Sequence, residues 1–122
     1  MRAYVAAPLC EGARRELDRA RGRAGEVKVR AVCLPPTRVG GRLDLAALGA
    51  NARRATEDSA AVAYLGEPDP VAGRFSLPIL DEAGITLLQS SSGSGAMSRL
   101  LTVIGDSDSS SSLREALHES QR

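Results

Sequence analysis

Two carboxylates in one short turn are the first candidates for chemistry in this sequence. Glu67 and Asp69 alternate with prolines in Gly66-Glu-Pro-Asp-Pro70, directly after an apolar run. Paired carboxylates can act as general acid and base, or they can hold a divalent cation. Between prolines in an exposed turn, acidic residues usually serve the turn itself. We therefore favour a structural role for this pair over a catalytic or metal-binding one.

A serine- and glycine-rich loop, Ser90-Ser-Ser-Gly-Ser-Gly95, is the second candidate. It follows an apolar run and precedes a helical pattern, so its backbone amides can cradle a carboxylate or phosphate. Its Gly-x-Gly lacks the third glycine of a dinucleotide fingerprint and follows the fourth expected strand rather than the first. A generic flexible loop is the favoured interpretation, and anion binding is the alternative.

Few side chains in this sequence could support nucleophilic catalysis or metal binding. The chain has two cysteines, Cys10 and Cys33, and one histidine, His118, in a charged C-terminal tail that we expect to fray. No cluster with metal-ligand spacing accompanies the cysteines, and neither has an evident base to activate it. We therefore expect no enzyme, no metal and no cofactor.

Length, charge and hydropathy limit the classes of protein to which this chain can belong. The 122 residues suit one domain, whose core must be aliphatic because only Tyr4, Tyr64 and Phe75 are aromatic. A net charge of +1 gives no indication of nucleic-acid binding. No run of about 18 apolar residues predicts a membrane-spanning helix, so we expect no membrane insertion. The short apolar N-terminal stretch predicts a strand rather than a signal peptide, which leaves the compartment open.

Four apolar runs predict strands, at residues 3–9, 27–34, 60–65 and 85–88. The second run starts with alternating apolar and basic residues, which is typical of an edge strand. The third run is continuous, as expected in the middle of a parallel sheet. Residues 37–42 are expected to be a loop, because Pro35-Pro36 ends the second strand.

Helical patterns lie between and after these strands. An arginine-rich surface helix is expected at residues 11–24, with a solvated basic face balanced by acidic neighbours. Asp44 is a candidate N-cap. Pro78 should kink the third helix or mark its effective start, and Gly84 should end it. Apolar stripes define the other three helices: Leu45, Leu48, Ala52 and Ala55; Val71, Phe75 and Ile79; Met97, Leu100, Leu101 and Ile104.

The alternation of strands and helices predicts an α/β fold, a three-layer doubly wound parallel sheet of about four strands in the flavodoxin-like order 2-1-3-4. We expect this unit at residues 1–105, followed at 106–122 by a serine-rich link and a short helix opened by a capping box at 112–115. Cys10 and Cys33 then lie near the carboxyl ends of neighbouring strands. A disulfide is possible at Cα separations of about 4.4–6.8 Å, and two buried thiols are favoured in a reducing compartment.

The segment YLGEPDPVAGRFSLPILDEAGITLLQSS, at residues 64–91, resembles the type I periplasmic binding proteins, the receptors of branched-chain amino acid ABC transporters. LGANARRATEDSAAVAYLGE, at 48–67, is similar to a second stretch of that family. The resemblance covers roughly residues 3–92 and matches only the first part of the N-terminal lobe, without a second lobe. It implies a location outside the cytoplasm.

Ligands of doubly wound sheets bind at the carboxyl ends of the strands, near the topological switch point. Together with the resemblance, this rule implies contacts from Leu9, from Glu67, Asp69 and Pro70, and from Ser90, Ser91 and Gly93. In the resemblance, Glu67 and Asp69 face the cleft between the lobes, where they can contact a cationic group of a ligand. Pro70 replaces a carboxylate-binding serine, and Gly93 lacks the family's hydroxyl.

The resemblance leads to a first hypothesis of a non-enzymatic, truncated solute-binding module for a small polar ligand such as an amino acid. Homodimerisation is expected, because a half-lobe leaves apolar surface uncovered. The alternative hypothesis is a flavodoxin-like protein-interaction domain in which the ancestral site has decayed and no small molecule binds.

Overall fold

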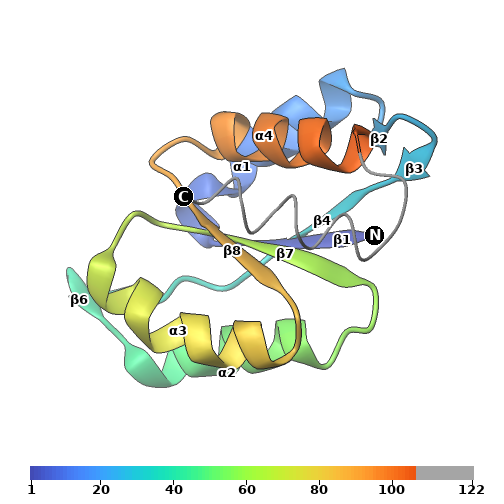
Figure 1. Ribbon diagram of the computed structural model, residues 1–122. Coiled ribbons are helices and arrows are strands. Elements are labelled where there is room, and N and C mark those ends of the chain that lie inside the picture. Colours follow the sequence, from blue (N-terminus) through green and yellow to red (C-terminus); the bar gives the residue numbers. More distant parts are fainter. Residues whose placement is uncertain (107–122) are drawn as a thin grey trace.

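A four-stranded parallel sheet forms the centre of the computed structural model, which describes residues 1–106. The strands follow the spatial order β4-β1-β7-β8 (Figure 1). Their bounds are Arg2–Val5 for β1, Arg30–Cys33 for β4, Ala61–Gly66 for β7 and Thr86–Gln89 for β8. This order confirms the expected doubly wound, flavodoxin-like arrangement.

Helices cover both faces of the sheet (Figure 1). On one face lie α1 (Ala7–Arg19) and α4 (Gly93–Gly105); on the other lie α2 (Leu45–Thr56) and α3 (Pro70–Glu82). We call these the α1/α4 side and the α2/α3 side. Each side encloses its own buried apolar cluster, because alternate strand residues point to opposite faces. In β1, for example, Val5 joins the α1/α4 cluster and Tyr4 joins the α2/α3 cluster.

The first strand is shorter than expected, because the chain turns into α1 at Ala7 rather than after residue 9. Pro8 sits in the first helical turn, where its missing N–H costs nothing and its fixed φ suits a helix. Leu9 is therefore a buried helix residue and not a strand residue. The helix ends at Arg19 rather than at residue 24.

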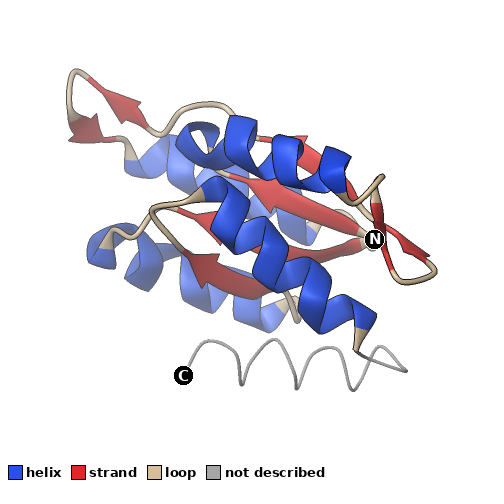
Figure 2. Ribbon diagram, turned by 90° about the horizontal axis from the view of Figure 1, so that it is seen from above, coloured by secondary structure: helices blue, strands red, loops and turns tan. Residues whose placement is uncertain are grey.

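Two short hairpins project from the sandwich (Figure 2). One consists of β2 (Arg23–Ala24) and β3 (Val27–Lys28), so the expected strand at 27–34 is divided in two. The other consists of β5 (Arg38–Val39) and β6 (Arg42–Leu43), where a plain loop was expected. Gly40 and Gly41 both have positive φ, 57° and 80°, as a two-residue hairpin turn of type I′ requires.

Helix α3 buries a different face from the one its sequence suggested. The predicted stripe is wrong at its start, since Val71 is 51% and Phe75 39% exposed. Gly73, Ser76 and Leu80 are buried instead. The ring of Phe75 lies against Gly49 of α2, while the small residues let α3 approach the sheet. Pro78 lies inside the helix, which continues to Glu82.

Helix α4 follows its predicted stripe, with Met97, Leu100 and Ile104 fully buried and Leu101 partly buried. Asp44 caps α2 as expected, because its Oδ1 accepts hydrogen bonds from the amides of Ala46 and Ala47. The predicted serine-rich link and the short helix lie outside the described residues. Within residues 1–106, no helix combines the length and hydropathy needed to cross a bilayer.

Candidate functional site

A small cavity lies at the carboxyl ends of β1 and β7, on the α2/α3 side. These two strands flank the switch point of the sheet, because the chain moves from β1 outward to β4 and then returns to β7 on the opposite side. Doubly wound folds bind their ligands at this position. The cavity has a volume of about 20 Å³ and is lined by Ala6, Thr37, Leu48, Tyr64, Gly66, Glu67, Ala72, Gly73, Ser76, Leu87 and Gln89.

Ser76 contributes an unpartnered polar atom to this cavity. Its side chain is buried, with 2% of the residue exposed, and its Oγ has no hydrogen-bond partner among the described residues. Burying an unpaired hydroxyl costs about 1–3 kcal/mol. An isolated polar atom of this kind, beside a cavity, indicates a place for a polar group that the protein does not itself supply.

Tyr64 lines the same cavity from β7 and keeps its proton. The pKa of the Tyr64 hydroxyl is raised to about 12, chiefly by burial; a hydrogen bond with Asn51 opposes the rise, and the nearby charge of Glu67 adds to it. Asn51 in turn donates from Nδ2 to the carbonyl of Pro35, at 3.0 Å. At neutral pH the phenol is therefore a neutral hydrogen-bonding group, held by α2 and unsuited to proton transfer.

Arg38 connects the β5–β6 hairpin to the acidic turn. Its guanidinium pairs with the carboxylate of Asp69 and lies 3.7 Å from that of Glu67. Arg38 could not be identified from the sequence, because residues 37–42 were expected to be a loop and no local pattern places the hairpin beside residue 69. A basic residue two positions before Gly40-Gly41 is the local signal that the sequence offers.

Asp69 has a structural function as well. Its Oδ1 accepts from the amides of Val71, at 2.9 Å, and Ala72, at 3.3 Å, and so caps α3. The pKa of this carboxyl is lowered, first by the hydrogen bond from Ala72, then by that from Val71 and by the Arg38 charge, while some desolvation opposes the shift. Asp69 thus has a structural role as a helix cap rather than as a turn residue alone, and its ionised carboxylate is engaged in that cap.

Gln89 is a second residue that the sequence did not identify. From the end of β8, its Nε2 donates to the carbonyl of Glu67, at 2.9 Å, and to that of Asp69, at 3.0 Å. This side chain fits because residue 73 is glycine: a Cβ there would lie 2.6 Å from Oε1 of Gln89. Gln89 therefore fixes the acidic turn to the edge of the sheet.

The serine loop makes most of its contacts with itself. Ser90 Oγ accepts a hydrogen bond from the amide of Ser92 and donates one to the carbonyl of Ser92, both at 3.1 Å. Ser92 Oγ accepts from the amide of Gly95 and so caps α4. Ser91 is exposed, and its hydroxyl forms no hydrogen bond with residues 1–106. Of the three predicted loop residues, Ser91 thus has the side chain most available to a ligand.

Gly93 and Leu9 meet on the α1/α4 side, away from the cavity. A Cβ at residue 93 would collide with the carbonyl of Leu9 and lie 2.9 Å from the amide nitrogen of Ala13. Gly93 thus permits the close packing of α4 on α1, and the Leu9 side chain is buried. The structure brings Glu67, Asp69 and Pro70 together with Gln89 and places Leu9 and Gly93 across the sheet from them.

Cys10 and Cys33 form a disulfide, with their Cα atoms 5.7 Å apart. The bond joins α1 to the end of the edge strand β4. It can form because β4 pairs with β1, the strand that leads into α1. Of the two possibilities that the sequence left open, the structure contains the bridged one. No group of three or more potential metal-ligating side chains occurs within residues 1–106.

Family models, curated proteins and solved structures were compared with this chain, and none of them matches it.

Proposed function

We propose that this chain is a non-enzymatic module that binds a small polar solute, such as an amino acid, at the carboxyl edge of its sheet. The observation that carries this proposal is the unpartnered Ser76 hydroxyl beside a cavity at the switch point. The resemblance of residues 64–91 to type I periplasmic binding proteins supports the same class of ligand.

The size of the cavity limits what enters it. About 20 Å³ admits one group of the size of a water molecule. We infer that a hydroxyl, amine or amide tip of the solute enters and pairs with Ser76 Oγ. The rest of the solute then lies over the edge of the sheet, beside Glu67 and the exposed Ser91.

The charged side chains at the carboxyl ends of the strands disfavour the binding of anions. Two carboxylates, Glu67 and Asp69, share one guanidinium from Arg38, which leaves a net charge of −1 on this group. An ammonium group can pair with Glu67, whose distance from Arg38 is long for an ion pair. A zwitterionic or cationic solute therefore suits the site better than a carboxylate or phosphate alone.

The titratable groups support binding rather than turnover. General acid–base catalysis works best when a group titrates near the working pH. The raised pKa of Tyr64 and the lowered pKa of Asp69 move both groups away from neutrality. Both side chains are also engaged in structural contacts, Tyr64 with Asn51 and Asp69 with the first turn of α3.

Calorimetric titration with leucine, phenylalanine, lysine and acetamide tests this proposal. We expect at least one of them to bind, and the Ser76→Ala variant to bind it about tenfold more weakly, since a hydrogen bond to a buried partner is lost. Ser98→Ala, which alters an exposed serine of α4, is the matched control and should bind normally. No heat with any compound, or equal binding by both variants, would contradict the proposal.

A protein-interaction domain without a small-molecule ligand is the second candidate function, and the edge of β8, which no strand of residues 1–106 pairs with, favours it. The homodimer expected from the sequence also remains a prediction. Sedimentation of the purified chain over a hundredfold concentration range tests it: a mass that stays at one chain excludes the dimer, and a concentration-dependent doubling supports it.

A further inference from the structure

Strand β8 leaves one row of its backbone groups without a partner among residues 1–106. It pairs with β7 on one side only. The amide of Ser90 donates to the carbonyl of Gly66, so alternate residues, including Leu88, direct their backbone groups toward β7. The amides and carbonyls of Leu87 and Gln89 therefore point away from the sheet, where a further strand can pair with them.

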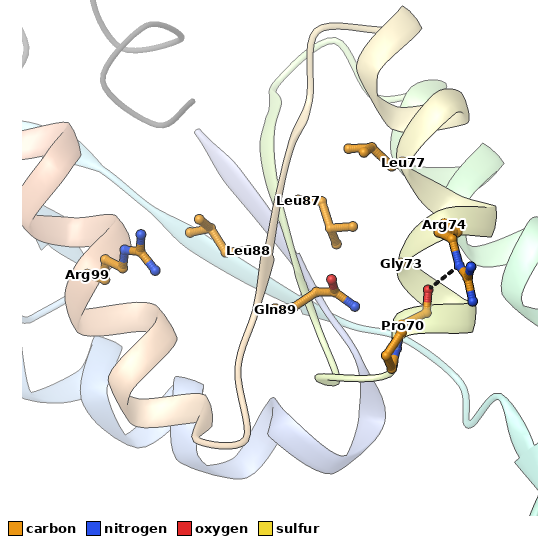
Figure 3. A pocket seen from close by; sticks show the side chains of 8 residues that line it. All are labelled: Pro70, Gly73, Arg74, Leu77, Leu87, Leu88, Gln89 and Arg99. Atoms are coloured by element: carbon orange, nitrogen blue, oxygen red, sulfur yellow. Dashed lines mark hydrogen bonds between the residues drawn. The ribbon is translucent and has the colours of Figure 1, made fainter. Parts of the chain in front are cut away.

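A groove runs along this edge between α3 and α4 (Figure 3). Its volume is about 620 Å³, and its lining is Pro70, Gly73, Arg74, Leu77, Leu87, Leu88, Gln89 and Arg99. The floor contains Leu87 and Leu88 together with the side-chain amide of Gln89, and Leu77 on the α3 wall is 45% exposed. A groove with leucine side chains, beside a strand edge that is unpaired among residues 1–106, suits an extended peptide, whose backbone pairs with the edge while its side chains contact the walls.

Both charges that line this groove are positive. Arg74 lies on the α3 wall and Arg99 on the α4 wall, on opposite sides of β8 (Figure 3). Arg74 donates from Nε to the carbonyl of Pro70, at 3.4 Å, and neither guanidinium forms an ion pair with residues 1–106. The groove thus presents a cation on each wall, which complements acidic side chains on both faces of an incoming strand.

We propose that β8 accepts an extended acidic segment of a partner protein as a fifth strand of the sheet. A second copy of this chain fits less well, because a twofold interface presents the same patch twice. A twofold dimer through this groove would place four arginines, Arg74 and Arg99 of each copy, in one interface, and the groove lining would contribute no carboxylate. The opposite edge of the sheet differs, since β4 begins with the exposed Arg30, a charge that discourages pairing. No residue of β8 is charged.

A short synthetic peptide tests the chemistry of this groove. In the end-blocked, fluorescently labelled peptide Val-Val-Glu-Glu-Val-Val, each face of the extended chain presents one glutamate between two valines. We expect saturable binding by fluorescence anisotropy. The lysine peptide Val-Val-Lys-Lys-Val-Val should bind at least about tenfold more weakly, because like charges then meet in the groove. Equal binding of both peptides, or binding of neither, overturns the proposal.

Charge reversal identifies the residues that contact the peptide. The double variant Arg74→Glu, Arg99→Glu should lose binding of the glutamate peptide and gain binding of the lysine peptide. Arg14→Glu, which alters an exposed arginine on α1, is the matched control and should keep the original preference. Because a gain of binding needs a folded protein, the reversed preference excludes simple unfolding; a double variant that keeps the original preference contradicts the proposal.

Hydrogen exchange identifies the backbone that pairs with the peptide. With the glutamate peptide bound, the amides of Leu87 and Gln89 should exchange at least about tenfold more slowly, whereas that of Leu88 is already directed toward β7 and should change little. Protection of Leu87 and Gln89 in the free protein, rising with protein concentration, would show that a second copy occupies the edge. It would overturn the proposal of a separate acidic partner.

Discussion

The two sides of the sheet differ in what they bury. The α1/α4 side encloses a cluster of aliphatic and small residues, drawn together by a glycine contact and a disulfide. The three buried polar residues of the described chain, Thr37, Asn51 and Ser76, all lie on the α2/α3 side, which also contains both tyrosines and the cavity. Buried polar groups cost free energy unless they are paired, and the Ser76 hydroxyl on the α2/α3 side has no partner among residues 1–106, so this side carries that penalty.

This contrast suggests that the two sides of the sheet contribute differently to stability and to the proposed binding. The α1/α4 side has the features that stabilise a fold, namely close packing and a covalent bond. The α2/α3 side has the features on which the proposed binding of a polar molecule rests, namely a cavity, a hydroxyl without a partner among residues 1–106, and a charged edge. Substitutions of buried residues on the α1/α4 side should therefore change stability, and substitutions around the cavity on the α2/α3 side should change binding of the proposed solute more than stability.

Removal of the disulfide should give the largest effect. For a bridge between residues 23 apart, the double variant Cys10→Ser, Cys33→Ser should lose about 3 kcal/mol of unfolding free energy, because the unfolded chain regains loop entropy. Urea unfolding with and without reductant measures this loss. Reductant should destabilise the original chain by a similar amount and leave the double variant unchanged; a reductant effect on the variant would point to another cause.

A matched pair of glycine substitutions compares the two sides directly. Gly93→Ala places a Cβ against the backbone of Leu9 and Ala13 on the α1/α4 side, and should cost about 2–3 kcal/mol. Gly49→Ala, in α2, meets the flexible end of Arg53 at 3.1 Å and the ring of Phe75 at 3.4 Å. The better helix propensity of alanine offsets this crowding, so its change should stay within about 1 kcal/mol.

Thermal or urea unfolding of both glycine variants decides this comparison. If Gly49→Ala proves as damaging as Gly93→Ala, the two sides are packed with equal tightness, and the contrast drawn above fails.

Ser76→Ala should raise stability while it lowers affinity. The substitution removes the unpaired hydroxyl, so the free energy of unfolding should increase by about 1 kcal/mol in the absence of solute. The same experiment on Ser98→Ala should show a smaller increase, about 0.5 kcal/mol or less, which reflects the helix propensity of alanine alone. A destabilised Ser76→Ala variant would show that the hydroxyl is satisfied in the folded protein, and the binding role of Ser76 would then lose its support.

Asp58 should give the smallest effect, and one that depends on pH. A hydrogen bond from Tyr4 is the main cause of its lowered pKa, with further contributions from the amide of Ala60 and from Arg2. A carboxyl with a lowered pKa stabilises the fold above its usual pKa of 3.8 and loses that contribution as the pH falls. Asp58→Asn should therefore be slightly destabilising at neutral pH, with the difference disappearing in acid.

Urea midpoints measured at neutral pH and in acid, with the exposed Asp18→Asn as control, test the prediction for Asp58. A difference between Asp58→Asn and the original chain that persists unchanged in acid would mean that packing, and not ionisation, is the cause.

The order of strands and helices could be predicted from the sequence, because it depends on local patterns. The continuous apolar run of β7 and the regular stripe of α4 are the clearest of these patterns, whereas the two short hairpins were not predicted. The buried face of α3 could not be predicted, because hydrophobicity favours Val71 and Phe75. The packing instead selects Gly73 and Ser76, whose small size lets α3 approach the sheet.

The candidate site was predicted only in part for a similar reason. The acidic turn was evident, since prolines mark it in the sequence. Its partners were not: Arg38 reaches Asp69 across 31 positions of the chain, and Gln89 reaches Asp69 across 20. Such pairs depend on how a hairpin and a strand end are placed in space, and no local pattern encodes that placement.

The disulfide also determines the covalent topology of the chain. It closes a ring that contains most of α1, the β2–β3 hairpin and β4. Within this ring, the hairpin region exposes several basic residues, including Arg21, Arg23 and Lys28, where trypsin can cut. A single cut there opens the ring without separating the molecule into two pieces. A nicked chain would keep its mobility on a non-reducing gel and divide only when the disulfide is reduced.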